Sequence, residues 1–141
     1  MVTAMATQAL HGLRVIEYGS FISAAYCGKL MADLGADVLK VEHPDGGDEA
    51  RQHGPFPNDQ PHPERSGLFL YLNMNKRGVT LDTATPTGQR LFRDLVRRAD
   101  VLVENWPPSF LAARRLAYEG LREISPALIM TSVTPFGQTG P

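Results

Sequence analysis

The sequence predicts an α/β fold, a Rossmann-like open and mostly parallel sheet with helices on both faces. Short apolar, β-branched runs alternate with segments of helical periodicity, in the order β-α-β-loop-β-α-β-α-β. The first strand, helix and strand fit within about thirty residues, which is the size of a βαβ unit. Because such units place their strands parallel to one another, an open α/β sheet follows.

The first unit begins with residues 13–18 (LRVIEY), an apolar run that ends before Gly19 and predicts a strand. Residues 21–34 carry apolar side chains among small ones, which predicts a closely packed helix that ends at Gly35. Residues 36–42 (ADVLKVE) predict the second strand.

The segment 43–66 is rich in Pro, Gly, Asp and His and shows no periodicity, so we expect a long functional or mobile loop. Residues 67–74 (GLFLYLNM) fit either a strand or a buried helical turn. Thr85 followed by Pro86 is typical of a helix start and predicts a helix that runs to about Arg98. The other expected elements are strands at 78–82, 100–104 and 127–133, short helices near 109–115 and 118–124, and a turn-like end at 135–141.

The chain has 141 residues and a net charge of −1, which suit one ordinary domain and indicate no nucleic-acid or acidic-membrane partner. Its one cysteine, Cys27, cannot form an internal disulfide, which fits a reducing compartment. Residues 1–9 have the composition of a flexible tail and no signal-peptide pattern, and no apolar run is long enough to span a membrane. We therefore expect a cytoplasmic protein.

The turn after the first strand is where dinucleotide-binding proteins carry G-x-G-x-x-G, and this chain has no such pattern there. A nicotinamide or flavin cofactor is therefore disfavoured. Gly19, Ser20 and Phe21 still lie at the sheet edge where α/β proteins bind ligands. From the turn alone, an ordinary strand-to-helix loop is the favoured interpretation of these residues.

The sequence predicts no metal site. Cys27 lies among small residues of a predicted helix, which favours a buried, inert thiol. Three histidines and three aspartates fall in or next to the long loop, but their spacing fits no zinc pattern. We interpret them as solvated loop residues: His43, Asp45, Asp48, His53, Asp59 and His62.

Three pairs of residues are each open to two interpretations. Residues 76–77 (Lys-Arg) either hold phosphates or form a charged surface turn. Residues 105–106 (Asn-Trp) follow a buried strand, and they either grip and stack a flat ring such as adenine or cap the strand and plug the domain edge. Residues 114–115 (Arg-Arg) either meet a phosphate or lie on a solvated helix face.

Several long motifs, taken in order, resemble those of family III CoA-transferases, which include the formyl-CoA, L-carnitine and bile-acid CoA-transferases. The resemblance covers residues 10–141, so we expect this segment to be the N-terminal portion of that family's large domain. The motifs are LHGLRVIEYG, CGKLMADLGADVLKVEHPDGGDEAR, SGLFLYLNMNKRGVTLD, TPTG, RRADVLVENW and SVTPFGQTGP.

The resemblance implies an enzyme that moves CoA from an acyl-CoA to a carboxylic acid through an Asp-linked intermediate, which is covalent catalysis. It implies no metal and no tightly bound cofactor, because CoA and acyl-CoA are substrates. Full-length members form an interlocked homodimer. Their nucleophilic Asp lies a few dozen residues beyond the G-Q-T-G-P motif, so we expect no catalytic residue in this chain, no activity alone and a tendency to self-associate.

The same resemblance assigns CoA contacts residue by residue. Two departures weaken the expected phosphate contacts: Ala84 stands where Lys is usual, and Ala113 precedes an Arg that is displaced by one position. His43 stands where a more basic side chain is frequent, and a neutral imidazole binds phosphate less strongly. The expected CoA-binding residues are Phe21 and Ile22 under the thioester arm, His43 and Arg114 at the phosphates, Leu81 at the adenine, and Asn105 with Trp106, which stands where Phe is usual.

Two other functions stay open. The 2-methylacyl-CoA racemases share this fold, although residues 73–77 (NMNKR) are more typical of the transferases. A non-catalytic module that binds CoA or another subunit would leave the catalytic residues to a second chain.

Overall fold

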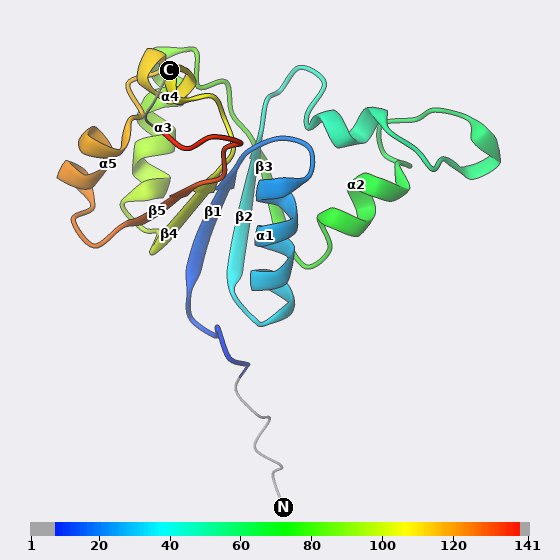
Figure 1. Ribbon diagram of the computed structural model, residues 1–141, viewed down its shortest axis with the longest axis horizontal. Helices are drawn as coiled ribbons and strands as arrows, with labels where there is room; N and C mark the ends of the chain where they lie inside the picture. The colour runs from blue at the N-terminus through cyan, green and yellow to red at the C-terminus, as the bar shows by residue number, and fades with distance from the viewer. Residues whose placement is uncertain (1–7, 139–141) are drawn as a thin grey trace, which may run out of the picture.

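A computed structural model describes residues 8–138, and five strands in this part form one sheet (Figure 1). The strand order is β3-β2-β1-β4-β5, and every neighbouring pair is parallel. The predicted α/β class is confirmed. Residues 1–7 of the predicted tail and 139–141 of the predicted turn lie outside the described residues. The strands are β1 (Arg14–Tyr18), β2 (Asp37–Glu42), β3 (Arg77–Thr80), β4 (Val101–Glu104) and β5 (Ile129–Ser132).

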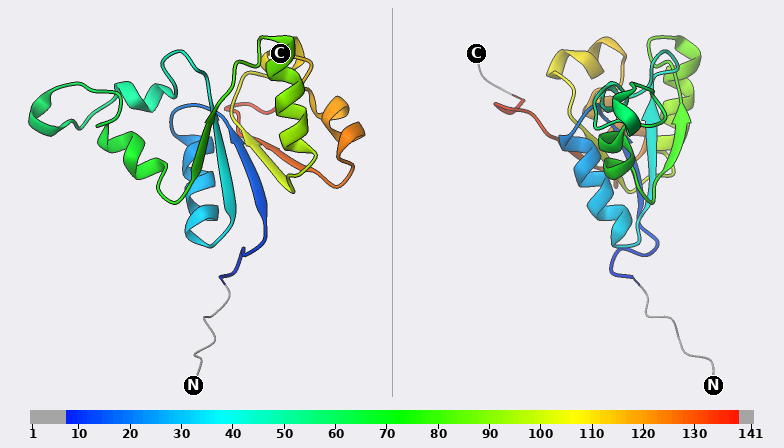
Figure 2. Two further views of the ribbon diagram at one scale, coloured as in Figure 1. Left: turned by 180° about the vertical axis from the view of Figure 1, so that it is seen from behind. Right: turned by 90° about the vertical axis from the view of Figure 1, so that its right-hand side faces the viewer.

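Helices cover both faces of the sheet, as the sequence predicts. α1 (Ser23–Asp33) lies on one face, and α3 (Pro86–Val96) and α5 (Tyr118–Ile124) lie on the other, which the edge-on view in Figure 2 shows. α2 (Gly67–Leu72) stands beside α1, and α4 (Pro108–Ala113) follows β4. No helix in the described part of the chain is long and apolar enough to cross a membrane.

Alternating side chains along β1 supply one apolar layer to each face of the sheet. Val15 packs with Ala24 and Ala32, whose small side chains let α1 approach the strands closely. Ile16 points the opposite way and packs in the larger core that contains Phe92 of α3. The alternation of side chains along this strand therefore explains the two layers.

The start of α3 forms as predicted. Thr85 Oγ1 accepts a hydrogen bond from Gly88 N (3.0 Å) and donates one to Asp82 O (2.8 Å). Pro86 occupies the first turn, where its missing N–H leaves no partner unsatisfied. The helix ends at Val96, two residues before the predicted end.

The segment that fits either a strand or a helical turn is the helix α2. Ser66 begins it, because its Oγ accepts a hydrogen bond from Phe69 N (3.0 Å) while donating one to Ala50 O (2.7 Å). The boundaries of the remaining predicted elements differ from the observed ones by at most two residues. The long loop contains two 3₁₀ turns, Glu49–Gln52 and Pro57–Asp59.

We expect Gly88→Ala to lower the free energy of unfolding by about 2–3 kcal/mol. A Cβ at this position would lie 1.8 Å from Asp82 O, a backbone atom that cannot rotate away. Urea unfolding followed by circular dichroism measures the change. Gly120 in α5 is the matched control: nothing lies within 4 Å of its built Cβ, so Gly120→Ala should be neutral or stabilise by at most about 1 kcal/mol. Equal losses in the two variants would contradict this account.

Candidate functional site

The loops after β1 and β4 (residues 19–22 and 105–107) meet where the strand order reverses, and we call them the crest. Asn105 joins them: its Oδ1 accepts from Ser20 N (2.9 Å), and its Nδ2 donates to Ser20 O (2.7 Å) and Ser23 Oγ (2.9 Å). A Cβ on Gly19 would come within 2.3 Å of Asn105 Oδ1, so glycine is needed for this approach. The amide of Asn105 thus holds the crest together, as the capping interpretation expects.

A pocket of about 170 Å³ opens beside the crest. Open α/β sheets bind ligands at this position, outside the carboxyl ends of the strands where the order reverses. The pocket is lined by four of the seven predicted CoA-binding residues: His43, Leu81, Trp106 and Arg114. The structure therefore brings together side chains from three separate segments of the sequence, which follow β2, β3 and β4.

An aromatic ladder forms one wall of this pocket. The rings of Trp106 and Phe110 stack with centroids 4.1 Å apart and planes inclined by 11°. The guanidinium carbon of Arg114 lies 3.5 Å from the Phe110 centroid, and its Nη1 donates to Phe110 O (3.2 Å). Phe110 lies on α4, Trp106 precedes this helix, and Arg114 is its C-cap residue. We call Trp106, Phe110 and Arg114 the ladder.

Two nitrogen atoms of the ladder, Trp106 Nε1 and Arg114 Nε, are buried without a hydrogen-bond partner among the described residues. Buried donors normally have a partner, so these two are candidates to contact a ligand. Glu104 holds the backbone of Trp106, the first residue of the ladder, because its buried Oε2 accepts a hydrogen bond from Trp106 N (2.7 Å). At the pocket floor, the hydroxyls of Tyr18 and Thr83 are hydrogen-bonded at 2.5 Å.

Burial raises the pKa of Tyr18, and the hydrogen bond to Thr83 offsets only part of that rise. The phenol is therefore neutral at physiological pH, and its position on the floor is fixed by Thr83. His43 also lines the pocket, and about half of its side chain is exposed. Its Nε2 is 3.6 Å from Asp82 Oδ1, and its Nδ1 accepts from Asp45 N (3.1 Å).

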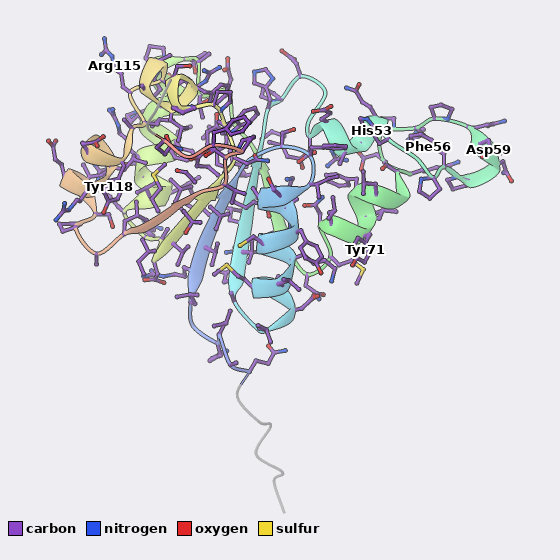
Figure 3. All side chains as sticks on the ribbon, viewed as in Figure 1. His53, Phe56, Asp59, Tyr71, Arg115 and Tyr118 are labelled. Carbon is purple, nitrogen blue, oxygen red and sulfur yellow. The ribbon has the colours of Figure 1, made fainter. Side chains whose placement is uncertain are left out.

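Phe21 and Ile22 do not line this pocket. Phe21 has a positive φ of 65°, its ring packs against His53 at 4.8 Å, and its N–H donates to Asp48 Oδ1 (3.0 Å). Ile22 precedes the first residue of α1 and is 46% exposed. Figure 3 shows His53 on the α2 side of the molecule, away from Arg115 and Tyr118 on the opposite side.

Four buried charged residues form a continuous ionic chain next to the crest. Lys40 Nζ lies 2.6 Å from Glu17 Oε1 and 2.6 Å from Asp48 Oδ2, and Lys76 Nζ lies 2.6 Å from Glu17 Oε2. Each of the four side chains is at most 2% exposed. Two cations and two anions balance, so the group carries no net charge. We call these residues the ionic chain.

The pKa values of the two lysines of the ionic chain are shifted in opposite directions. Burial alone would lower the pKa of Lys40, but the carboxylates of Glu17 and Asp48 outweigh it and raise that pKa. For Lys76, burial is the stronger effect and lowers the pKa, although Glu17 opposes it. Lys76 also donates to Ala25 O (2.7 Å), so its ammonium is used inside the protein.

Lys76 and Arg77 therefore do not form the phosphate site that one interpretation of this pair suggests. Lys76 is buried in the ionic chain, and Arg77 makes a surface ion pair with Asp37 (2.6 Å). Arg77 is on the surface, as the second interpretation expects, but it begins the strand β3 and does not lie in a turn.

The ionic chain reaches the pocket through Asp48, which lies on its rim. Asp48 Oδ1 accepts from both Phe21 N (3.0 Å) and Ala50 N (2.8 Å). Asp48 N donates to Glu42 Oε2 (2.9 Å), and Arg51 holds the same carboxylate at 2.7 Å and 2.9 Å. Burial would raise the pKa of Glu42, but these hydrogen bonds lower it, so the carboxylate is ionised at neutral pH. The start of the long loop is therefore firmly attached to the sheet.

The structure describes no group of three or more His, Cys, Asp or Glu residues in 8–138 that could hold a metal ion. The ring nitrogens of two loop histidines contact residues that are close to them in the sequence. His53 Nδ1 lies 3.1 Å from Glu49 O, and His62 Nδ1 accepts from Glu64 N (3.1 Å). Burial, with the nearby charge of Glu17, raises the pKa of the Cys27 thiol. A protonated thiol is a poor nucleophile.

Residues 10–141 match the profile of CoA-transferase family III. The chain belongs to this family. It is 45% identical over 134 residues to the succinate–glutarate CoA-transferase of Agrobacterium fabrum, with 94% of this chain and 34% of that enzyme covered. It is 39% identical over 132 residues to the formyl-CoA:oxalate CoA-transferase of Bradyrhizobium diazoefficiens, with 93% and 30% covered.

Solved structures of the family show the same fold. A crystal structure of a CAIB/BAIF family protein from Brucella suis matches with a TM-score of 0.86 at 39% identity, covering 96% of this chain and 35% of that one. The chain thus spans about a third of the length of the relatives that it matches.

The structure shows where the two expected departures from the family motifs lie, and neither Ala84 nor Ala113 lines the pocket. Ala84 is exposed in the turn before α3, where its N–H donates to Asp82 Oδ1 (2.9 Å). Ala113 is exposed at the end of α4. The displaced Arg114 nevertheless lies on the pocket wall, because it stacks on Phe110.

The ionic chain is the part of the site that sequence reasoning missed. A signal was present, since Glu17 and Lys40 interrupt the apolar runs that predict β1 and β2. Charged residues in buried strands need partners, and that requirement points to a buried network. The role of Phe110 was also missed, although its spacing of four from both Trp106 and Arg114 indicates a shared helix face.

We expect Glu17→Gln to lower the free energy of unfolding by about 3–5 kcal/mol, because it leaves two buried ammonium groups without their shared counter-ion. Chemical denaturation measures the loss. Asp37→Asn is the control: it breaks the ion pair with Arg77, whose members are 67% and 48% exposed, and should cost less than about 1 kcal/mol. Similar small losses in both variants would show that the ionic chain does not stabilise the fold.

Proposed function

We propose that the pocket beside the crest binds the adenine end of coenzyme A. We further propose that this chain is the CoA-binding part of an enzyme that moves CoA from an acyl-CoA to a carboxylic acid. The observation that carries the proposal is the ladder, which places a guanidinium against aromatic faces at the strand-order reversal. A ligand that joins a flat base to phosphates needs both kinds of group side by side.

Each pocket residue has a role in this proposal. Trp106 and Leu81 supply apolar contact for the base, and the buried Trp106 Nε1 is available to one of its acceptors. Arg114 supplies the positive charge for the phosphates, and His43 lines the same pocket. Asn105 acts on the ligand indirectly, because all three of its hydrogen bonds hold the crest.

The pocket is too small for a whole CoA molecule. Sites for drug-sized ligands usually measure about 300–1,000 Å³, whereas this one measures about 170 Å³. We therefore assign the base and the adjoining phosphates to the pocket. Phe21 and Ile22 belong to the crest but lie outside the pocket, and we propose that the thioester arm passes over them.

The relatives described above are named as CoA-transferases, which favours transfer over racemisation. We propose that the reaction passes through an Asp-linked intermediate and that no residue of this chain is the nucleophile. CoA and acyl-CoA are substrates in this scheme, a carboxylic acid is the acceptor, and no metal or tightly bound cofactor takes part. The whole enzyme is proposed to be a cytoplasmic, interlocked homodimer.

Direct CoA binding tests the pocket assignment. Trp106 is the only tryptophan of the chain, so its fluorescence should change saturably when CoA is added. Arg114→Met should weaken binding about tenfold or more, because a hydrogen bond to a charged group contributes about 1.5–3 kcal/mol. Isothermal titration calorimetry gives the same comparison without relying on Trp106.

Arg115→Met is the matched control, because Arg115 is exposed and does not line the pocket. It removes the same charge one residue away and should leave CoA affinity within about twofold, as expected for a screened surface charge. Equal weakening in both variants would indicate a diffuse charge effect. No CoA binding at all would overturn the assignment.

We expect the purified chain to show no CoA transfer from succinyl-CoA to glutarate, the acids named for the Agrobacterium fabrum relative. The physical reason is that none of its residues is proposed to form the acyl intermediate. Chromatographic detection of glutaryl-CoA measures the reaction, with a full-length family member as the positive control. Turnover by this chain would show that a residue within it supplies the nucleophile.

A further inference from the structure

A second cavity, larger than the pocket beside the crest, lies between α4, α5 and the end of β5. It measures about 470 Å³, whereas the pocket beside the crest measures about 170 Å³. Cavities that hold small ligands usually measure about 300–1,000 Å³. In Figure 1, α4 and α5 lie on the same side of the molecule as β5, and Figure 3 labels Tyr118, which lines the cavity from α5. We call this space the α4–α5 cavity.

Glu104, at the carboxyl end of β4, lines the α4–α5 cavity. It is only 1% exposed, so its carboxylate is almost completely removed from bulk water. Its Oε2 accepts a hydrogen bond from Trp106 N (2.7 Å), which is an uncharged donor. No ion pair within residues 8–138 involves Glu104, and every Lys, Arg and His of the sequence lies in that range.

The other buried charges of the described part of the chain are paired. Glu42 pairs with Arg51, Lys29 pairs with Asp33, and the members of the ionic chain pair with one another. Acidic residues are almost never fully buried without a partner, because the hydration that the charge loses has to be replaced. A buried carboxylate that lines a cavity and has no counter-ion therefore indicates that a ligand supplies the positive charge.

The other polar groups of the cavity favour a cation over an anion. Glu119 adds a second carboxylate, and none of the described residues that line the cavity is Lys, Arg or His. Arg122, which follows on α5, lines a neighbouring hollow instead. Ser132 and Gln138 add neutral oxygen atoms that can accept hydrogen bonds. Two carboxylates repel a carboxylic acid or a phosphate, so the acceptor acid and the CoA phosphates do not suit this cavity.

The uncharged walls of the cavity suit an apolar stem. Pro107, Leu111 and Met130 supply hydrocarbon surface. The ring of Tyr118 is 38% exposed, and the face of an aromatic ring attracts cations. A long side chain or a small molecule with a charged end uses both kinds of surface, because its stem packs on apolar groups while its head pairs with a charge.

We propose that the α4–α5 cavity is a second binding site, which takes a guanidinium or ammonium group carried on a short apolar stem. The cation pairs with the carboxylate of Glu104, and the stem packs against Leu111 and Met130. This head group occurs on free organic amines and guanidines and on the Arg and Lys side chains of polypeptides. The inference goes beyond the proposed function, because it requires neither CoA binding nor transfer.

A pair of matched probes tests the charge requirement. n-Butylguanidinium carries the head and the stem of an arginine side chain, and isothermal titration calorimetry should show saturable binding with a dissociation constant of about 1 mM or below. n-Butylurea has a similar shape without the charge and should bind at least about tenfold more weakly, because a hydrogen bond between charged groups is the stronger one. Absence of n-butylguanidinium binding, or equal binding of the two probes, would overturn the proposal.

A pair of matched variants tests the place of the charge. Glu104→Gln keeps the shape of the side chain and should weaken n-butylguanidinium binding at least about tenfold. Its midpoint of urea unfolding should stay equal or rise, because the substitution leaves no buried cation unpaired. Glu123→Gln is the control: Glu123 is exposed on α5 and does not line the cavity, so binding should stay within about twofold.

Each other result of these variants contradicts the proposal. Equal weakening in both would show a diffuse charge effect. A marked loss of stability in Glu104→Gln would show that the carboxylate already has a partner inside the protein. CoA supplies a further check, because the two cavities share no lining residue. Saturating CoA should therefore not displace n-butylguanidinium, and displacement would place the cation in the pocket beside the crest.

A third probe, N-acetylarginine N-methylamide, distinguishes the two sources of the head group. Binding about tenfold tighter than that of n-butylguanidinium would indicate the side chain of a polypeptide, because the added peptide groups then contribute. Equal or weaker binding would indicate a free organic cation. Either result supports the site, whereas failure of this probe and of n-butylguanidinium together would overturn it.

Discussion

The rest of the structure depends on the position of the Glu17 carboxylate, which lies between Lys40 and Lys76 in the interior. Taking charges out of water is costly, and a buried ion pair often stabilises a fold no better than apolar residues of the same volume. Removing only one partner destabilises the fold strongly, because the other charge then stays buried without a counter-ion. The ionic chain therefore acts mainly as a constraint, allowing only arrangements in which β1, β2 and the turn before β3 keep their positions.

The same constraint extends to the helix and the crest. A Cβ on Gly28 would lie 2.2 Å from Glu17 Oε2, so α1 packs directly on the carboxylate and only glycine allows it. α1 in turn carries Ser23, whose hydroxyl accepts from Asn105 at the start of the loop after β4. From Asp48, the ionic chain also reaches the loop on the opposite rim of the pocket. Both sides of the pocket are thus positioned by buried polar groups, and of the ionic chain only Asp48 lines the pocket itself.

Local patterns in the sequence predict the fold well, because short apolar, β-branched runs and a capped helix start need no distant partner. The ionic chain needs distant partners: Glu17 and Lys40 are 23 residues apart, and the sequence does not show which charges meet. The pocket is less predictable from the sequence than the fold and more predictable than the ionic chain. His43, Leu81, Trp106 and Arg114 come together because the carboxyl ends of parallel strands share one edge. Phe21 and Ile22 follow β1 at that edge too, but the positive φ of Phe21 directs the chain away.

α1 packs closely on one face of the sheet. Its inner side rests on the sheet through Ala24, Gly28 and Ala32, which have almost no side-chain volume. Small residues at these positions let α1 lie close to the strands. The first turn of α1 carries Ser23, which is tied to Asn105, so the close packing of this helix also helps to position the crest.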